Sequence, residues 1–262
     1  MKILLIAGHG GTPYDSGAVG CGYTEAVETR RMADAVAPLL RSYGFEVALY
    51  DQSRDAYKVV TQGGSLPLSG VGYVLEFHPN SAANDPNGNG RTTGTEIFVH
   101  TNEQGVGVEQ AILRRVCALG FTNRGIKRSS GLAVLKHVFK RGVSHALVET
   151  CFIDDKDDME LYGAKFDAIA EAIADGVAEG FGKEIDDMTE AQTRAIAKEE
   201  ANKMQPKRYR AVSDMPEYMR ADMQALIDEK VLTGKGGSEA DKGLDLTEDM
   251  ARMLIMMRRM IN

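Results

Sequence analysis

The chain has 262 residues, of which 43% are hydrophobic and 26% charged, and its formal net charge is −7 at pH 7. This composition suits a globular protein with a sizeable core, and the acidic balance argues against a general nucleic-acid binder. Three cysteines without a Cys-x-x-Cys pair indicate neither a disulfide framework nor a zinc ribbon. No apolar run approaches the roughly 20 residues that span a bilayer.

The N-terminal part of the chain alternates predicted strands and helices. The run KILLIA at residues 2–7 is typical of a buried parallel strand, and it stops abruptly at a histidine set between glycines. After a turn-rich loop, Thr24 precedes a helix with an acidic first turn, which ends at Tyr43-Gly44. A strand over residues 45–50 completes one βαβ unit.

Further elements follow in the same alternation. We expect a short helix over residues 55–60, strands over 72–78 and 95–100 with a surface loop between them at 81–93, a helix over 108–119, strands over 132–135 and 145–148, and an amphipathic helix over 165–181. This order predicts an α/β domain at residues 1–182, with a mostly parallel twisted sheet flanked by helices.

The composition changes after this domain. Residues 183–207 are charged and almost free of large apolar side chains, which suits a linker or an exposed helix. Ten of the 13 methionines lie at or after Met188. Residues 208–262 therefore form a predicted small all-α module, with helices over about 213–231 and 246–261. Four methionines at helical spacing in the last helix indicate core packing: Met250, Met253, Met257 and Met260.

Three potential metal ligands are predicted to meet at one edge of the sheet. His9 follows the first strand, His78 ends the third, and Glu25 begins the first helix. Ligands bind at the carboxyl ends of parallel strands, so these side chains are expected to converge there. Two imidazoles and a carboxylate are a common set for a catalytic zinc ion. Glu149, just after the strand at 145–148, is expected at the same edge as a proton acceptor and donor.

The ordered motifs around these residues span about residues 1–182: GHGG at 8–11, Glu25, EFHPNS at 76–81, GTEIF at 94–98 and ALVETCFI at 146–153. Together they resemble the zinc-dependent N-acetylmuramoyl-L-alanine amidases of the amidase-3 family. The resemblance implies that family's fold and one zinc ion on His9, Glu25 and His78, with Glu149 as the catalytic carboxylate. It also implies cleavage of the amide between N-acetylmuramic acid and L-alanine in peptidoglycan.

Some features depart from the family or narrow the resemblance. Pro79 and Cys151 stand where the family usually has a small residue and a glycine, at the rim of the site and without removing a ligand. The short helical insert and the lack of a signal peptide look more like phage or prophage endolysins than secreted autolysins. We therefore expect synthesis in the cytoplasm and action at the bacterial cell wall after release.

Other residues receive structural interpretations, with two alternatives left open. Glu28, one turn after Glu25, competes for its role as a ligand. The sequence shows no histidine positioned to activate Cys151 as a catalytic thiol. Glu96 is interpreted as structural rather than substrate-binding. The remaining histidines are interpreted as ordinary surface or core residues: His100, His137 and His145.

Two other functions are alternatives to the amidase interpretation. The first is a zinc peptidase or carboxypeptidase that acts on the stem peptide, and the second is a non-catalytic cell-wall-binding protein. Residues 208–262 faintly resemble one S-layer-homology-type repeat, so we expect this module to bind a cell-wall polymer or to mediate self-association through its methionine-rich helices. Peptidoglycan is the expected partner, and neither nucleic acid binding nor membrane insertion is expected.

Overall fold

The computed structural model describes residues 1–11, 15–185, 208–229, 231–232, 246–247, 250–251, 253–255 and 258. The chain divides into two compact units, Met1–Met188 and Thr189–Asn262. The linker predicted at 183–207 lies outside the described residues except for 183–185. Among the helices described, none is both long and apolar enough to cross a membrane.

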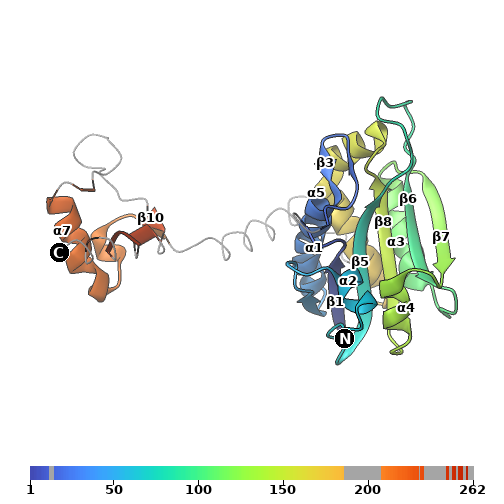
Figure 1. Ribbon diagram of the computed structural model, residues 1–262, viewed down its shortest axis with the longest axis horizontal. Coiled ribbons are helices and arrows are strands. Elements are labelled where there is room, and N and C mark those ends of the chain that lie inside the picture. Colours follow the sequence, from blue (N-terminus) through green and yellow to red (C-terminus); the bar gives the residue numbers. More distant parts are fainter. Residues whose placement is uncertain are drawn as a thin grey trace. The chain divides into compact units, whose positions relative to one another are not determined.

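The first unit is built on a six-stranded sheet with the order β4-β1-β5-β8-β6-β7 (Figure 1). Neighbouring strands are parallel except for β6 and β8, so β6 and β7 run opposite to the other four. The predicted mostly parallel sheet is thus confirmed. The strands are β1 (Lys2–Ala7), β4 (Glu46–Leu49), β5 (Val71–Asn80), β6 (Thr95–His100), β7 (Asn123–Ser129) and β8 (Ser144–Phe152).

Helices cover both faces of this sheet. One face packs against α1 (Glu25–Ser42), α3 (Gly107–Ala118) and α5 (Lys156–Gly180), and the other against α2 (Ala56–Thr61) and α4 (Ala133–Phe139). Side chains of β1 alternate between two buried clusters, with Ile3 and Leu5 in the larger and Leu4 and Ile6 in the smaller. A strand buried on both faces needs a continuous apolar run, and this run is what predicts β1 from the sequence.

Three elements of the first unit differ from their predictions. The run at 132–135 is the start of α4 and not a strand, because a short apolar run has no period that separates a strand from a buried helix. Strand β7 was missed because its sequence, NRGIKRS, carries the charges of an edge strand. Helix α5 begins at Lys156 instead of 165, with a non-helical residue at Lys165.

Two further details of the first unit matter for the site: the length of β8 and a hairpin before α1. Strand β8 continues through Phe152, so Glu149 lies inside the strand and not beyond it. The loop between β1 and α1 contains a short antiparallel hairpin of β2 (Val19–Gly20) and β3 (Tyr23–Thr24). This hairpin leads directly into the first turn of α1.

The second unit has its own small core. Its described elements are β9 (Arg208–Tyr209), η1 (Val212–Asp214), α7 (Glu217–Asp228) and β10 (Leu246–Thr247). Because β9 and β10 pair as antiparallel strands, the module is not all-α as predicted. The core includes three buried methionines and residues of the last helical segment: Met215, Met219, Met223, Ala251 and Ile255.

The methionine stripe of the last helix was predicted to pack in this core, and that prediction is wrong for its first two members. Met250 is 47% exposed and Met253 60% exposed, while Ala251 and Ile255 face the core instead. Several apolar residues lie on different sides of this helix, so spacing alone selected the wrong side. Met257 and Met260 lie outside the described residues.

Candidate metal centre and active site

His9 reaches the site from a tight turn after β1. Its φ of 63° lies in the left-handed region, which costs about 1 kcal/mol or more for a residue with a Cβ. The turn passes very close to β5, because a Cβ on Gly8 would lie 2.2 Å from Cε1 of His78. Glycine at this position therefore lets the two histidine-bearing segments lie side by side.

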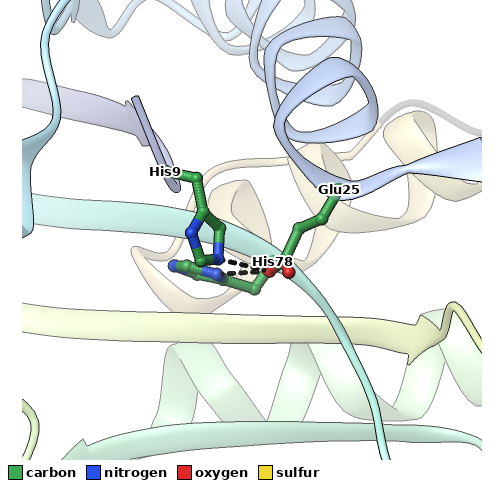
Figure 2. A group of neighbouring side chains, drawn as sticks. All are labelled: His9, Glu25 and His78. Atoms are coloured by element: carbon green, nitrogen blue, oxygen red, sulfur yellow. Dashed lines mark hydrogen bonds and ion pairs between the residues drawn. The ribbon is translucent and has the colours of Figure 1, made fainter. Parts of the chain in front are cut away.

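Glu25 enters the site from the first turn of α1. Its Oε2 accepts a hydrogen bond from the backbone N–H of Ala18 at 2.8 Å. Its Oε1 lies 2.8 Å from Nδ1 of His78 and 3.0 Å from Nε2 of His9 (Figure 2). One carboxylate oxygen is thus held by the loop while the other faces both imidazoles.

The three side chains form a group with the chemistry of a metal site. One ligand atom from each of His9, Glu25 and His78 lies within 4.8 Å of the other two. Burial by itself would raise the pKa of Glu25, but hydrogen bonds from His78 and His9 lower it to about 2. A carboxylate that stays ionised between two imidazoles needs a proton or a cation among them, and this donor set fits zinc.

Each histidine uses its second ring nitrogen to contact another carboxylate. Nδ1 of His9 lies 3.0 Å from Oδ2 of Asp15, and Nε2 of His78 lies 3.4 Å from Oε1 of Glu76. Carboxylates in this position orient metal-binding imidazoles and select the tautomer that leaves the other nitrogen free. Asp15 and Glu76 had no predicted role. The only signal for them in the sequence was a polar residue near each histidine, and for Glu76 its place inside an apolar strand.

Glu149 lies beside His78 in the sheet. The two residues are register partners on the neighbouring parallel strands β5 and β8, and Glu96 is the partner of Glu149 on its other side. Oε2 of Glu149 is buried, and no described residue hydrogen-bonds to it. Burial raises the pKa of Glu149 to about 7, although the nearby imidazole of His78 opposes the shift. A carboxyl with this pKa can both accept and donate a proton near neutral pH.

The structure also places the competing residues. Glu28 is buried and pairs with Arg31 at 3.3 Å instead of joining the histidines. Oε1 of Glu96 accepts a hydrogen bond from Asn80, and its Oε2 pairs with Arg124, both at 2.9 Å. The geometry therefore brings Glu25, and not Glu28, to the histidines.

The structure also shows the contacts of Cys151, His100 and His145, none of which was predicted to act in catalysis. Cys151 is fully buried against Met159, and burial raises the pKa of its thiol well above the usual range, which disfavours a reactive thiolate. His100 stacks on Phe139 with ring centroids 3.8 Å apart. His145 differs from the expectation of an ordinary histidine, because its Nε2 lies 3.1 Å from Oε2 of Glu76, directly behind the site.

A cavity of 260 Å³ opens beside the histidines. Its walls include His9 and His78, Tyr57 of α2, and residues 132–135 at the start of α4. The segment that was predicted to be a strand thus forms an apolar wall of the site. The cavity is large enough to receive part of a substrate next to the candidate metal ligands.

A second acidic group lies away from this centre, and its carboxylates already accept hydrogen bonds from backbone N–H groups and a hydroxyl. Asp155 accepts hydrogen bonds from the backbone and the hydroxyl of Thr93, at 3.0 and 2.6 Å. Asp157 accepts from the backbone of Asn89 and Gly90, both at 2.8 Å. These hydrogen bonds hold the loop between β5 and β6 against the start of α5.

Comparisons with known proteins give one family match. The model of a family described as N-acetylmuramoyl-L-alanine amidase matches residues 3–179, more than half of the chain. No curated protein matches the chain.

Several solved structures are similar to the first unit. The amidase AmiC2 of Nostoc punctiforme has 21% identity and a TM-score of 0.55, over 70% of this chain and 98% of that one. The catalytic domain of the CD27L endolysin, which targets Clostridia Difficile, has 23% identity and a TM-score of 0.54, over 71% and 99%. A putative amidase from Neisseria meningitidis has 26% identity and a TM-score of 0.53, over 70% and 97%.

Proposed function

The chain belongs to the N-acetylmuramoyl-L-alanine amidase family, and on this premise we propose that it is a zinc-dependent peptidoglycan hydrolase. Its substrate is the amide bond between the lactyl group of N-acetylmuramic acid and the L-alanine of the stem peptide. The observation that carries the proposal is the single oxygen of Glu25, which faces His9 and His78 at 3.0 and 2.8 Å. Such a three-ligand group leaves a position open for catalysis.

We propose that His9, Glu25 and His78 hold one zinc ion through Nε2, Oε1 and Nδ1. A bound zinc ion supplies Lewis-acid polarisation of the scissile carbonyl and makes water more acidic. Asp15 and Glu76 keep the two imidazoles in the orientation that this set requires. Oε2 of Glu149 is buried and has no hydrogen-bond partner among the described residues, which supports the fit, because a polar atom enclosed in this way needs a partner that arrives with substrate or water.

Glu149 then moves the proton of the reaction. As a carboxylate it accepts a proton from the attacking water, and as a carboxylic acid it delivers that proton to the amine of L-alanine as the C–N bond breaks. Its pKa of about 7 suits both steps. The cavity lined by His9, His78 and the start of α4 receives the substrate next to the proposed zinc ligands.

For residues 208–262 the proposal is a separate role. A unit with its own buried core at Met215, Met219 and Met223, and with exposed apolar side chains at Met253 and Tyr218, suits attachment to a cell-wall polymer or self-association. The test is wall binding and sedimentation of a chain shortened to residues 1–188. If the short form binds walls equally and sediments as expected for its mass, both roles are removed.

The bond that breaks in a defined muropeptide tests the enzymatic proposal. We expect mass spectrometry to show free N-acetylmuramic acid termini and an L-alanine amine, with no new reducing sugar. A peptidase would release other amines, and a wall-binding protein would release none. Glu149→Gln should reduce turnover by about 10²–10⁴-fold while the zinc content of the purified protein stays at one ion. Full activity of this variant would refute the role of Glu149.

A further inference from the structure

We propose that Glu76 and His145 form a buried positioning pair that sets the zinc affinity of His78, an inference that rests on the zinc site proposed above. The three side chains form a continuous line behind the ligand. Nε2 of His78 lies 3.4 Å from Oε1 of Glu76, and Oε2 of Glu76 lies 3.1 Å from Nε2 of His145. The line ends at His145, and among the described residues none makes a hydrogen bond of good geometry to either of its ring nitrogens or to Oε2 of Glu76.

The sheet itself places these groups in one row. Residues 76 and 78 are two apart on β5, and side chains two apart on a strand share a face. Val74 and Leu147 are the register partners of His145 and Glu76 across the β5–β8 pair. His145 and Glu149 therefore share the face of β8 that adjoins Glu76 and His78. The ligand and its supporting pair come from two adjacent strands whose pairing fixes their spacing.

The pair is almost completely removed from water. Glu76 is 3% exposed and His145 is 2% exposed. A buried carboxylate is costly unless it is paired, and replacing a buried ionic pair by apolar residues is often neutral or stabilising. Stability alone therefore gives little reason for polar side chains at this position, whereas the orientation of a metal ligand does.

The chemistry of the line determines which nitrogen of His78 is free. An ionised carboxylate only accepts hydrogen bonds, so Glu76 requires the proton of His78 to be on Nε2. The lone pair of Nδ1 is then available on the side that faces Glu25, where the zinc ion is proposed to bind. His145 contacts the other oxygen of this carboxylate, with its Nε2 3.1 Å from Oε2 but without hydrogen-bond geometry, and by this contact it holds Glu76 in place. His145 acts only through Glu76, and Glu76 only through His78, so both are positioning residues.

Zinc affinity of the full-length, chelator-treated protein tests this proposal, with the metal alone as the probe and a competing chromophoric chelator as the reporter. Loss of a carboxylate that orients a metal-binding histidine typically weakens metal binding by about 10–100-fold, which is the effect expected for Glu76→Leu. Glu76→Gln keeps an acceptor and should lose less. His145→Leu should weaken zinc binding by about tenfold, and His145→Gln, which keeps a donor, should largely restore it.

The double variant separates a positioning pair from two independent residues. Because His145 acts through Glu76, the variant with Glu76→Leu and His145→Leu should bind zinc no more weakly than Glu76→Leu alone. Additive losses would overturn the proposed line, as would zinc affinities of the single variants within twofold of the wild type. Thermal unfolding of the metal-free variants monitors the fold.

A matched control shows whether burial of a carboxylate is sufficient for the effect. Glu109 is also 3% exposed, lies on α3, and accepts a hydrogen bond from Tyr73 at 2.6 Å. Glu109→Gln should leave zinc affinity unchanged; an equal loss there would refute the specific role of Glu76. A wild-type chain that binds no zinc overturns the proposed function together with this inference, whereas a wild type that binds zinc with unaffected variants overturns the inference alone.

Discussion

Replacing Glu149 by glutamine in the metal-free protein isolates the effect of burying one carboxyl, since the variant keeps the shape of the side chain and removes its charge. Burial raises the pKa of Glu149 from 4.5 to about 7. A tenfold change in proton affinity corresponds to about 1.4 kcal/mol, so the difference between the two pKa values corresponds to about 3 kcal/mol of folding free energy.

The sign follows from which state holds the proton more tightly. Below the unfolded pKa of 4.5 both states are protonated, and the carboxyl does not reduce stability. As the pH rises toward 7, the unfolded chain loses this proton first, so the folded wild type is progressively destabilised. We therefore expect Glu149→Gln to be about as stable as the wild type near pH 4.5 and more stable by about 3 kcal/mol near pH 8.

Urea unfolding of the chelator-treated protein at a series of pH values measures this difference, with the transition of the first unit followed by circular dichroism. Subtracting the wild type from the variant removes the contributions of titratable groups that do not interact with Glu149; His78 does interact with it, and its charge opposes the shift. Glu160→Gln is the matched control, because Glu160 is an exposed carboxylate of α5 that pairs with Lys156 at 3.7 Å. That variant should show no trend with pH.

A stability difference that is flat across this pH range would refute the reasoning, because Glu149 would then titrate alike in both states. Saturation with zinc provides an internal check. A nearby cation favours the ionised carboxylate, so the gap between the variant and the wild type at pH 8 should shrink when zinc is present.

Three further predictions concern the ligands, a glycine and the second unit. Glu25→Gln should lose most of its bound zinc on purification, while Glu28→Gln should keep it, as judged by metal analysis; the reverse would exchange the two roles. Gly8→Ala should weaken zinc binding by at least tenfold, because a Cβ there would lie 2.2 Å from the imidazole carried by β5. Gly105→Ala, with no atom within 4 Å of the added Cβ, should leave zinc binding unchanged. Met253→Ser should alter the stability of the second unit by less than about 0.5 kcal/mol, since that side chain is 60% exposed, and a loss of 2 kcal/mol would place it in the core.

The sequence by itself determined the parts of this protein that depend on short stretches of chain. The apolar run of β1, the acidic first turn of α1 and the order of strands and helices define an α/β domain. They also put His9, Glu25 and His78 near element ends that meet at one edge of the sheet, although β5 continues two residues beyond His78. These predictions needed only the local rules that end a strand or start a helix, together with the ordered motifs that resemble one family.

Only the tertiary structure decided which distant residues surround those three. His145 lies behind His78 because β5 pairs with β8 in a particular register, and a shift of one residue would turn its side chain to the opposite face. The start of α4 forms the cavity wall although its short apolar run has no distinctive period. Pairing and register between segments far apart in the chain are set by packing of the whole core, and local patterns do not encode them.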